Sequence, residues 1–172
     1  MRSVDEHKQQ APASVACQVI TVSDTRSPDN DTSGKLMMEL LENGGFSVVD
    51  YRIVKDDYEA LRNLLHESSE DKKIEAVLLT GGTGISPRDT TYEAVRSMLS
   101  LGKELPGFGE LFRYLSFTED IGSAAILSRA MAGVIGETAI FSMPGSSGAV
   151  KLAMERIILP ELRHIMRELY KA

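Results

Sequence analysis

Short apolar runs alternate along this chain with segments whose apolar residues recur at helical spacing, and this alternation limits the possible folds more than any other feature. Four runs bounded by turn residues are typical of buried strands: 16–22, 48–54, 74–80 and 138–143. Val134 and Ile135 indicate a further strand that pairs beside the last of these. Because the runs are apolar on both faces, they favour a parallel sheet covered by helices on both sides.

Helical patterns fill the intervals between these runs. They cover 32–43, 58–66, 91–101, roughly 107–116, 119–131 and 147–170. Gly44-Gly45 is the expected stop signal of the first, 90–93 is predicted to form a capping box before the third, and Pro160 is predicted to kink or restart the last. The pattern as a whole predicts a three-layer α/β/α domain whose central sheet is mostly parallel.

Composition narrows the class of protein. The chain has 172 residues, of which 42% are hydrophobic and 26% charged, as in one globular domain. Its net charge of −6 argues against bulk attraction to nucleic acid or to an anionic membrane. A phosphorylated ligand stays possible, because a local cluster of backbone N–H groups can hold an anion.

The N-terminal residues, the lengths of the apolar runs and the single cysteine predict a tail, a compartment and a buried side chain. Residues 1–14 are polar and lack periodicity, so we expect a disordered tail before a domain that covers 15–172. No apolar run approaches the length that spans a bilayer, and the start does not resemble a signal peptide, so the expected compartment is the cytoplasm. Cys17 lies in an apolar run and is expected to be a small core side chain.

Three loops that follow predicted strands have an unusual composition. Since ligands of open parallel sheets bind at the carboxyl ends of strands, these loops (23–34, 80–90 and 143–148) are the expected binding region. The candidate ligand-binding residues are Ser23, Asp24, Ser33, Gly34, Gly81, Gly82, Thr83, Gly84, Ser86, Arg88, Pro144, Gly145, Ser146 and Ser147.

The loop 80–90 is the most informative. Three glycines in the four residues 81–84 allow positive φ and a close approach to a ligand, and consecutive N–H groups can form an anion-binding nest. Arg88 can neutralise phosphate, and Asp89 can hold a metal ion or accept a proton. The loop is neither a P-loop nor a dinucleotide fingerprint, since both spacings are missing. Alone, the glycine motif also fits a plain tight turn, and Arg88 could pair with Asp89, although its place beside the glycines favours a ligand role.

Other polar residues near the strand ends have structural alternatives. Ser146 or Ser147 could cap the last helix. Asp56 or Asp57 could cap the helix that follows the second strand, and Asp24 and Asp31 could be turn formers. The residues alone do not separate these structural roles from ligand binding.

The motif Gly81-Gly82-Thr83-Gly84, followed by 88–94 (RDTTYEA), resembles the signature of the MoaB/MogA family, which is related to the G domain of gephyrin. Further motifs match in order: 22–24 (VSD), 31–34 (DTSG), 106–113 (PGFGELFR), 128–130 (SRA) and 143–146 (MPGS). The resemblance extends from about residue 15 to about residue 165.

The resemblance implies a molybdopterin-binding, MogA-like α/β/α fold that assembles as a homotrimer or a hexamer. Proteins of the MogA branch transfer AMP from ATP to the phosphate of molybdopterin, release pyrophosphate and require Mg²⁺. Asp89 and Asp56 match the acidic positions that this family is expected to use for catalysis and magnesium. Gly81 to Gly84 match its phosphate-binding loop.

Lys55, which precedes Asp56 where MogA-like proteins tend to carry Pro, places the resemblance closer to the MoaB branch. Two functions therefore stay open: a molybdopterin adenylyltransferase that uses Mg-ATP, and a carrier that binds molybdopterin without chemistry. A competence-associated relative on the same scaffold would bring an additional domain, for which we expect no room in this chain. Nucleic acid and membrane are not expected partners.

Overall fold

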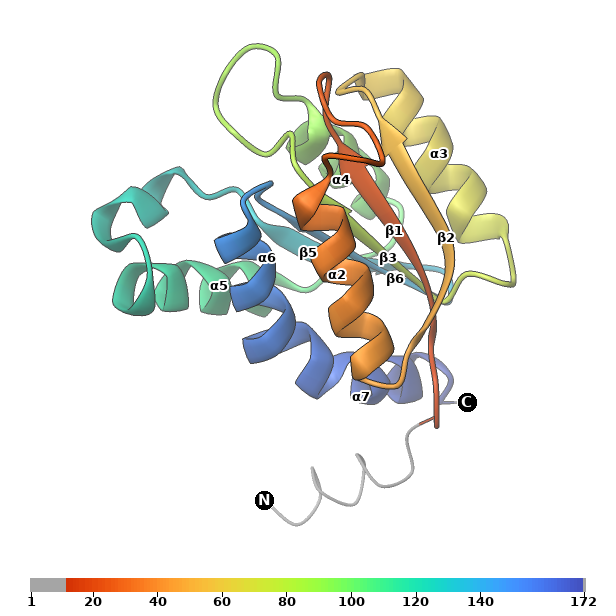
Figure 1. The fold of residues 1–172 in the computed structure, drawn as a ribbon. Coiled ribbons are helices and arrows are strands. Elements are labelled where there is room, and N and C mark those ends of the chain that lie inside the picture. The colour runs from red at the N-terminus through yellow and green to blue at the C-terminus, as the bar shows by residue number, and fades with distance from the viewer. Residues whose placement is uncertain (1–11, 172) are drawn as a thin grey trace.

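The computed structural model describes residues 12–171, and its central layer is a six-stranded sheet in the order β2-β1-β3-β6-β5-β4 (Figure 1). Four strands are parallel: β2 (Ser47–Val54), β1 (Ala16–Val22), β3 (Ala76–Thr80) and β6 (Thr138–Met143). At one edge, β5 (Met131–Ile135) runs antiparallel to β6, and the two-residue β4 (Lys103–Glu104) runs antiparallel to β5. The predicted, mostly parallel sheet is thus confirmed.

Helices cover both faces of the sheet, which confirms the three-layer prediction. One face packs against α2 (Thr32–Asn43), α5 (Pro106–Glu119), α6 (Ser147–Ala153) and α7 (Leu159–Leu169). The other packs against α3 (Tyr58–Glu70) and α4 (Thr91–Leu99). Alternation along β1 sends Cys17 and Val19 into the first core and Ile20 and Val22 into the second.

Strand register brings the candidate loops together. Thr21 of β1 lies beside Thr80 of β3, and Thr80 lies beside Met143 of β6. Because these strands are parallel, their carboxyl ends reach the same edge of the sheet, at the top of Figure 1 for β1 and β3. The loops that follow β1, β3 and β6 therefore emerge next to one another.

The prediction of a helix over 119–131 is wrong. The structure has a 3₁₀ segment, η1 (Gly122–Leu127), then extended backbone that leads into β5. Gly122 has φ +57°, which interrupts an α-helix after α5. Residues 128–130 are held by long-range hydrogen bonds to the Gly-rich loop and to Arg113 of α5, which local helical spacing does not reveal.

Smaller differences concern element ends. The strand predicted over 74–80 begins at Ala76, because the N–H of Ile74 bonds Asp71 O in a turn. Helix α3 extends to Glu70, α4 ends at Leu99, and β4 was not predicted.

The last helical stretch changes its winding before Pro160. Between α6 and α7 lies a π-helical turn, η2 (Met154–Ile158), and Pro160 sits in the first turn of α7. Pro160 has no N–H to donate, and it follows directly on this wider π-helical turn. The predicted restart at Pro160 is therefore confirmed.

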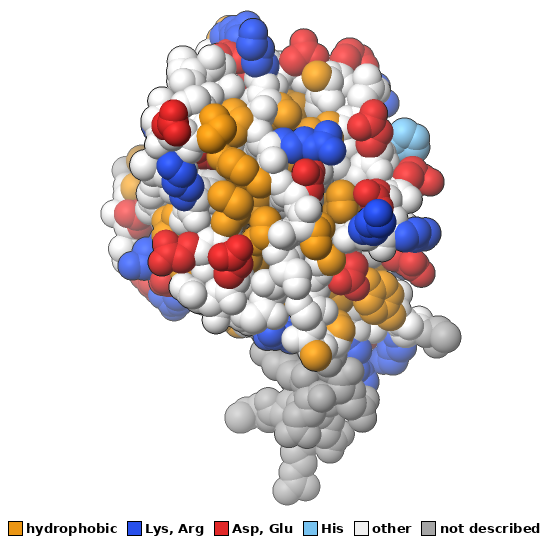
Figure 2. Space-filling model, turned by 45° about the vertical axis from the view of Figure 1, so that its right-hand side comes forward, with side chains coloured by type: hydrophobic (Ala, Val, Ile, Leu, Met, Phe, Trp, Pro, Cys, Tyr) orange, Lys and Arg blue, Asp and Glu red, His pale blue; other side chains and the backbone are white. Residues whose placement is uncertain are grey.

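Charged side chains of both signs are interspersed on the face drawn in Figure 2, without a broad basic area. This distribution agrees with the acidic net charge. Within residues 12–171, none of the helices has the length and apolar character needed to traverse a bilayer. The predicted tail, 1–14, lies mostly outside the described residues.

Candidate functional site at the carboxyl ends of the strands

The loops after β1, β3 and β6 enclose a small crevice of about 120 Å³, called here the strand-end crevice. It lies at the edge of the sheet where the parallel strands end. Of the predicted residues it contains Ser23, Ser33, Gly81 and Gly145, which come from three separate loops. The other lining residues are Thr21, Val22, Arg26, Asp31 and Thr80.

Two glycines of the crevice lie where one backbone segment packs closely against another. A Cβ on Gly81 would lie 2.2 Å from Val22 O, and Gly81 has φ +102°. A Cβ on Gly145 would lie 3.2 Å from Gly81 Cα. The hydroxyl of Ser33 donates to Gly145 O at 2.7 Å and so ties the first loop to the third. The crevice therefore depends on residues that permit this packing.

Asp31 organises the floor of the crevice. Its buried carboxylate caps α2 by accepting from Gly34 N at 2.9 Å. It also accepts from the hydroxyls of Thr21 at 2.6 Å and Tyr51 at 2.5 Å. Burial, followed by the bond to Asp31, raises the pKa of Tyr51 above its ordinary value. Asp31, which the sequence offered only as a turn former, is thus the N-cap of α2, and Gly34 lies within the first turn of that helix.

The Gly-rich loop presents unused backbone donors. Within residues 12–171, the N–H groups of Gly82, Thr83, Gly84 and Ile85 make no hydrogen bond. Gly82 has φ +66°, and the loop leads into α4. Consecutive free N–H groups before a helix N-terminus are the arrangement that binds anions.

Asp89 shapes the far side of this loop. Its Oδ2 accepts from Ser86 N at 3.0 Å, and a Cβ on Gly84 would lie 2.6 Å from the same oxygen. The half-buried side chain lines an open hollow of about 540 Å³, called here the helix-side hollow. Its lining residues are Tyr58, Ile85, Ser86, Pro87, Asp89, Thr90, Glu93 and Arg129.

Asp56 and Asp57 have different roles. Asp57 caps α3 by accepting from Ala60 N at 2.8 Å. Asp56 Oδ1 instead accepts from the backbone N of Thr90 at 3.0 Å and from its hydroxyl at 2.6 Å. The capping box predicted over 90–93 is therefore wrong, because the Thr90 side chain is engaged by Asp56 and gives no cap bond to α4.

Asp24 and Arg88 join the first loop to the second. The Arg88 guanidinium bonds the Asp24 carboxylate, so the alternative of an Arg88–Asp89 pair is wrong. The hydrogen bond from Arg88 holds the pKa of Asp24 below its usual value, and Lys55 and the N–H of Asp56 lower it further. Both side chains face solvent beside the Gly-rich loop, where a phosphate could compete for Arg88.

The third loop combines structural and exposed groups. Ser146 caps α6 by accepting from Ala149 N at 3.1 Å, as the structural alternative predicted. Ser147 Oγ lies 3.5 Å from Ser33 Oγ, and Pro144 O accepts from the Thr80 hydroxyl at 3.1 Å. The capping residue thus sits beside the crevice rather than in its lining.

A magnesium ion would find a partial coordination set here. Asp56 Oδ2 and Asp89 Oδ1 carry no hydrogen bond among the described residues, and Thr90, which bonds Asp56, directly follows Asp89. Residues 12–171 contain no group of three or more acidic, His or Cys side chains suited to a metal. Mg²⁺ commonly takes one or two carboxylates and completes its shell with water and substrate phosphates. The two aspartates fit that mode.

The cysteine takes no part in the site. Cys17 is completely buried in β1, and burial, with a smaller effect of Glu75, raises the pKa of its thiol to about 12. A thiol in this state is not a nucleophile at neutral pH. Its predicted place in the core is confirmed.

Residues 18–164 match the family described as "Probable molybdopterin binding domain". Two relatives named molybdenum cofactor biosynthesis protein B, from Halalkalibacterium halodurans and Bacillus subtilis, are each 60% identical over 169 residues and 98% of both chains. The chain belongs to the MoaB/MogA family. The family expected from the sequence motifs is thus confirmed.

Solved structures of the MoaB/MogA family share the fold. A crystal structure of a molybdenum cofactor biosynthesis protein B has a TM-score of 0.90 and 52% identity, over 95% of this chain and 100% of that one. A MogA structure has a TM-score of 0.79 and 28% identity, over 90% and 99%. The higher identities to proteins named MoaB or protein B confirm that this member lies closer to the MoaB branch.

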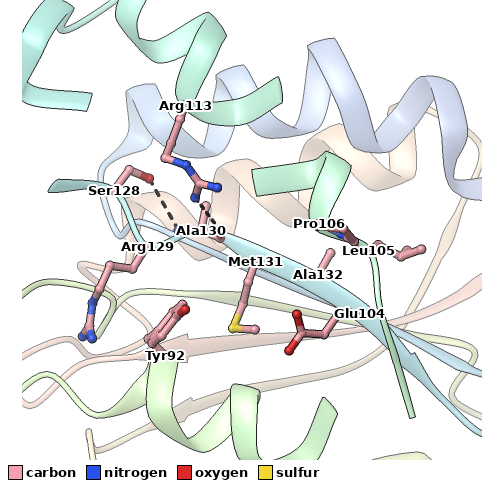
Figure 3. A pocket seen from close by; sticks show the side chains of 10 residues that line it. All are labelled: Tyr92, Glu104, Leu105, Pro106, Arg113, Ser128, Arg129, Ala130, Met131 and Ala132. Carbon is pink, nitrogen blue, oxygen red and sulfur yellow. Dashed lines mark hydrogen bonds between the residues drawn. The ribbon is translucent and has the colours of Figure 1, made fainter. Parts of the chain in front are cut away.

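Sequence reasoning missed Arg129, Arg26 and the hydroxyls of Thr21 and Thr80. Arg129 borders both the helix-side hollow and a third hollow of about 300 Å³ between α4, α5 and β5 (Figure 3). Its signal was its place in the family motif 128–130. Thr80 is the last residue of β3 and Thr21 the second last of β1, and both line the crevice.

Proposed function

We propose that this protein acts in molybdenum cofactor biosynthesis by binding molybdopterin and transferring AMP from Mg-ATP to the molybdopterin phosphate. The observation that carries the proposal is the run of unused N–H groups from Gly82 to Ile85, which has Asp56 on one side and Asp89 on the other. Membership in the MoaB/MogA family and the names of the relatives support the pathway.

The chain's own groups suit this reaction. The amide groups of the Gly-rich loop would hold phosphate oxygens, and Arg88 would turn from Asp24 to neutralise a further phosphate. Asp56 and Asp89 would hold Mg²⁺, which supplies charge neutralisation and orientation of the phosphate oxygens. No covalent nucleophile is needed, since one phosphate oxygen attacks the α-phosphate of ATP and pyrophosphate leaves.

A carrier function is the second candidate. It is favoured by the identity of 60% to MoaB-type proteins against 28% to MogA. The same amide groups would then hold the pterin phosphate without transfer of AMP. The two candidates share the binding site and differ only in the chemistry that follows.

The assembly belongs to the same proposal. Leu111, Tyr114 and Phe117 recur at a spacing of three residues on α5 and are 54%, 64% and 58% exposed. An apolar face of this kind is typical of protein interfaces. We propose that it contributes to a homo-oligomer, as a trimer or a hexamer, in the cytoplasm. Phe117→Glu should then lower the molar mass measured by analytical ultracentrifugation.

Incubation with molybdopterin, Mg²⁺ and ATP tests the function. Release of pyrophosphate together with adenylylated pterin, and neither without the pterin, is the expected result. Tight pterin binding without product would exclude the transferase and support the carrier. Absence of both binding and product would contradict both candidates.

A further inference from the structure

Arg129 contacts the Gly-rich loop from the segment before β5, whose first residue, Met131, pairs with Ser142 near the end of β6. It lies just before β5, and its Nε donates to Thr83 O at 3.0 Å while Nη2 donates to Gly84 O. The same guanidinium pairs with Glu93 of α4 and lies over the Tyr92 ring, 4.8 Å from its centroid. Figure 3 shows Arg129 and Tyr92 side by side, with Arg129 directed away from Arg113.

These two carbonyl bonds have a consequence for the neighbouring amides. In a planar trans peptide, the N–H points opposite to the C=O. The carbonyls of Thr83 and Gly84 point toward Arg129, so the N–H groups of Gly84 and Ile85 point away from it. These are two of the donors that make no hydrogen bond within residues 12–171.

We propose that Arg129 is a positioning residue that holds the peptide planes of the Gly-rich loop with their N–H groups turned outward, ready for the phosphate of the ligand. This inference rests on the proposed function. The glycines allow the loop many conformations, and two fixed carbonyls select one of them.

The other contacts of Arg129 keep its guanidinium in place. Its side chain is 23% exposed and stands between the Glu93 carboxylate and the Tyr92 ring. Burial raises the pKa of Glu93, but the bond from Arg129, the backbone bond and the Arg129 charge outweigh it and hold that pKa below its usual value. A planar fork can bond two carbonyls and a carboxylate together, which the single ammonium of lysine cannot reproduce.

The donor atoms of Arg129 bond the protein itself, unlike those of a residue that contacts phosphate directly. Its Nε, Nη1 and Nη2 atoms all donate to the protein, to Thr83, Gly84 and Glu93. A direct role would need an N–H that these bonds leave unused or would need one of the bonds to break, whereas a positioning role uses the bonds as they are. The two roles predict different responses to a change of charge beside Arg129.

The test compares Arg129→Gln and Arg129→Lys with Arg163→Gln. Arg163 is a matched control, because it also bonds two carbonyls, those of Gly44 and Gly45, and lies over an aromatic ring, that of Phe46. Arg163 borders none of the hollows around the Gly-rich loop. The measurements are NMR order parameters of the amides of 82–85 without ligand, and the Kd for molybdopterin.

Both Arg129 variants should lower the order parameters of 82–85 from about 0.85 to below about 0.6. They should also raise the Kd for molybdopterin by about 10-fold or more, while Arg163→Gln changes neither quantity. Unchanged loop order in Arg129→Gln would overturn the proposal. Since order is measured without ligand, this result is distinct from a failure of the wild-type protein to bind molybdopterin.

Glu93→Gln separates positioning from direct charge attraction. It removes a negative charge but keeps an oxygen that accepts from Arg129. If Arg129 positions the loop, Glu93→Gln should leave the affinity unchanged or weaken it up to about 3-fold. Tighter binding in Glu93→Gln, or full affinity in Arg129→Lys with a disordered loop, would show that the charge itself matters and would contradict the inference.

Discussion

Asp56 and Thr90 are joined by two hydrogen bonds, in which one carboxylate oxygen accepts from both the backbone N and the hydroxyl of the threonine. The acidic residue after β2 is thereby fixed to the residue that follows Asp89. This connection brings two acidic positions, far apart in sequence, to either side of one loop. It leaves Asp56 Oδ2 without a hydrogen bond among the described residues.

Asp56→Asn should separate the structural part of this contact from the charge. The amide oxygen can still accept from Thr90, so we expect the free energy of unfolding to change by less than about 1 kcal/mol. Turnover should fall on the order of 100-fold, because the site loses a charge that would hold Mg²⁺. Chemical denaturation and the dependence of the rate on Mg²⁺ measure the two effects. Asp56→Ala, which also loses the contact to Thr90, should be less stable than Asp56→Asn.

Gly82→Ala should weaken pterin binding through a steric clash, in addition to the cost of a positive φ. A Cβ there would lie 2.0 Å from Thr91 Oγ1 and 2.5 Å from Asp56 Oδ2, at φ +66°. Gly122 is the matched control, because it has φ +57° but no atom within 4 Å of its added Cβ. Gly122→Ala should cost roughly 1 kcal/mol and leave pterin affinity unchanged. Equal affinity of both variants, by isothermal titration, would show that the packing at Gly82 is irrelevant to binding.

Arg88→Gln should raise the pKa of Asp24 toward its ordinary value of 3.8. In the wild-type protein the hydrogen bond from Arg88 holds that pKa lower. The pair therefore contributes its full stabilisation above pH 3.8 and loses it as the pH falls through the lower folded-state pKa. An NMR titration of the Asp24 carboxyl carbon measures both values. The same pKa in both proteins would mean that the contact does not form in solution.

Asp31→Ala should destabilise the fold by about 3 kcal/mol. It removes the cap of α2 and leaves the hydroxyls of Thr21 and Tyr51 without their acceptor in a buried setting. Tyr51→Phe removes only one donor and should cost about 1 kcal/mol. Urea denaturation measures both. A cost for Asp31→Ala no larger than that for Tyr51→Phe would contradict the central role of this carboxylate.

The sequence pattern predicted the ends of an element most accurately where its residues are fully buried. The strands 16–22 and 138–143 have the predicted ends, because nearly every residue in them is buried and the run has sharp limits. The prediction of a helix over 119–131 failed because residues 128–130 are bonded to α5 and to the Gly-rich loop. Partners distant in sequence override a local apolar spacing.

The candidate site was predicted as a set of loops rather than as a set of contacts. Strand order places those loops at one edge, so Ser33, Gly81 and Gly145 meet as the rule for parallel sheets predicts. The partners of the charged residues could not be predicted. Arg88 bonds Asp24, which is 64 residues away, and Arg129 bonds Gly84, which is 45 residues away.

Asp89→Asn tests the central proposal most directly. The amide oxygen can keep the bond from Ser86 N, so the loop and the affinity for molybdopterin should be retained within about 2-fold. In a single turnover with Mg-ATP and molybdopterin, formation of adenylylated pterin should be on the order of 100-fold slower than in the wild-type protein. A full rate in this variant would contradict the proposed catalytic role of Asp89.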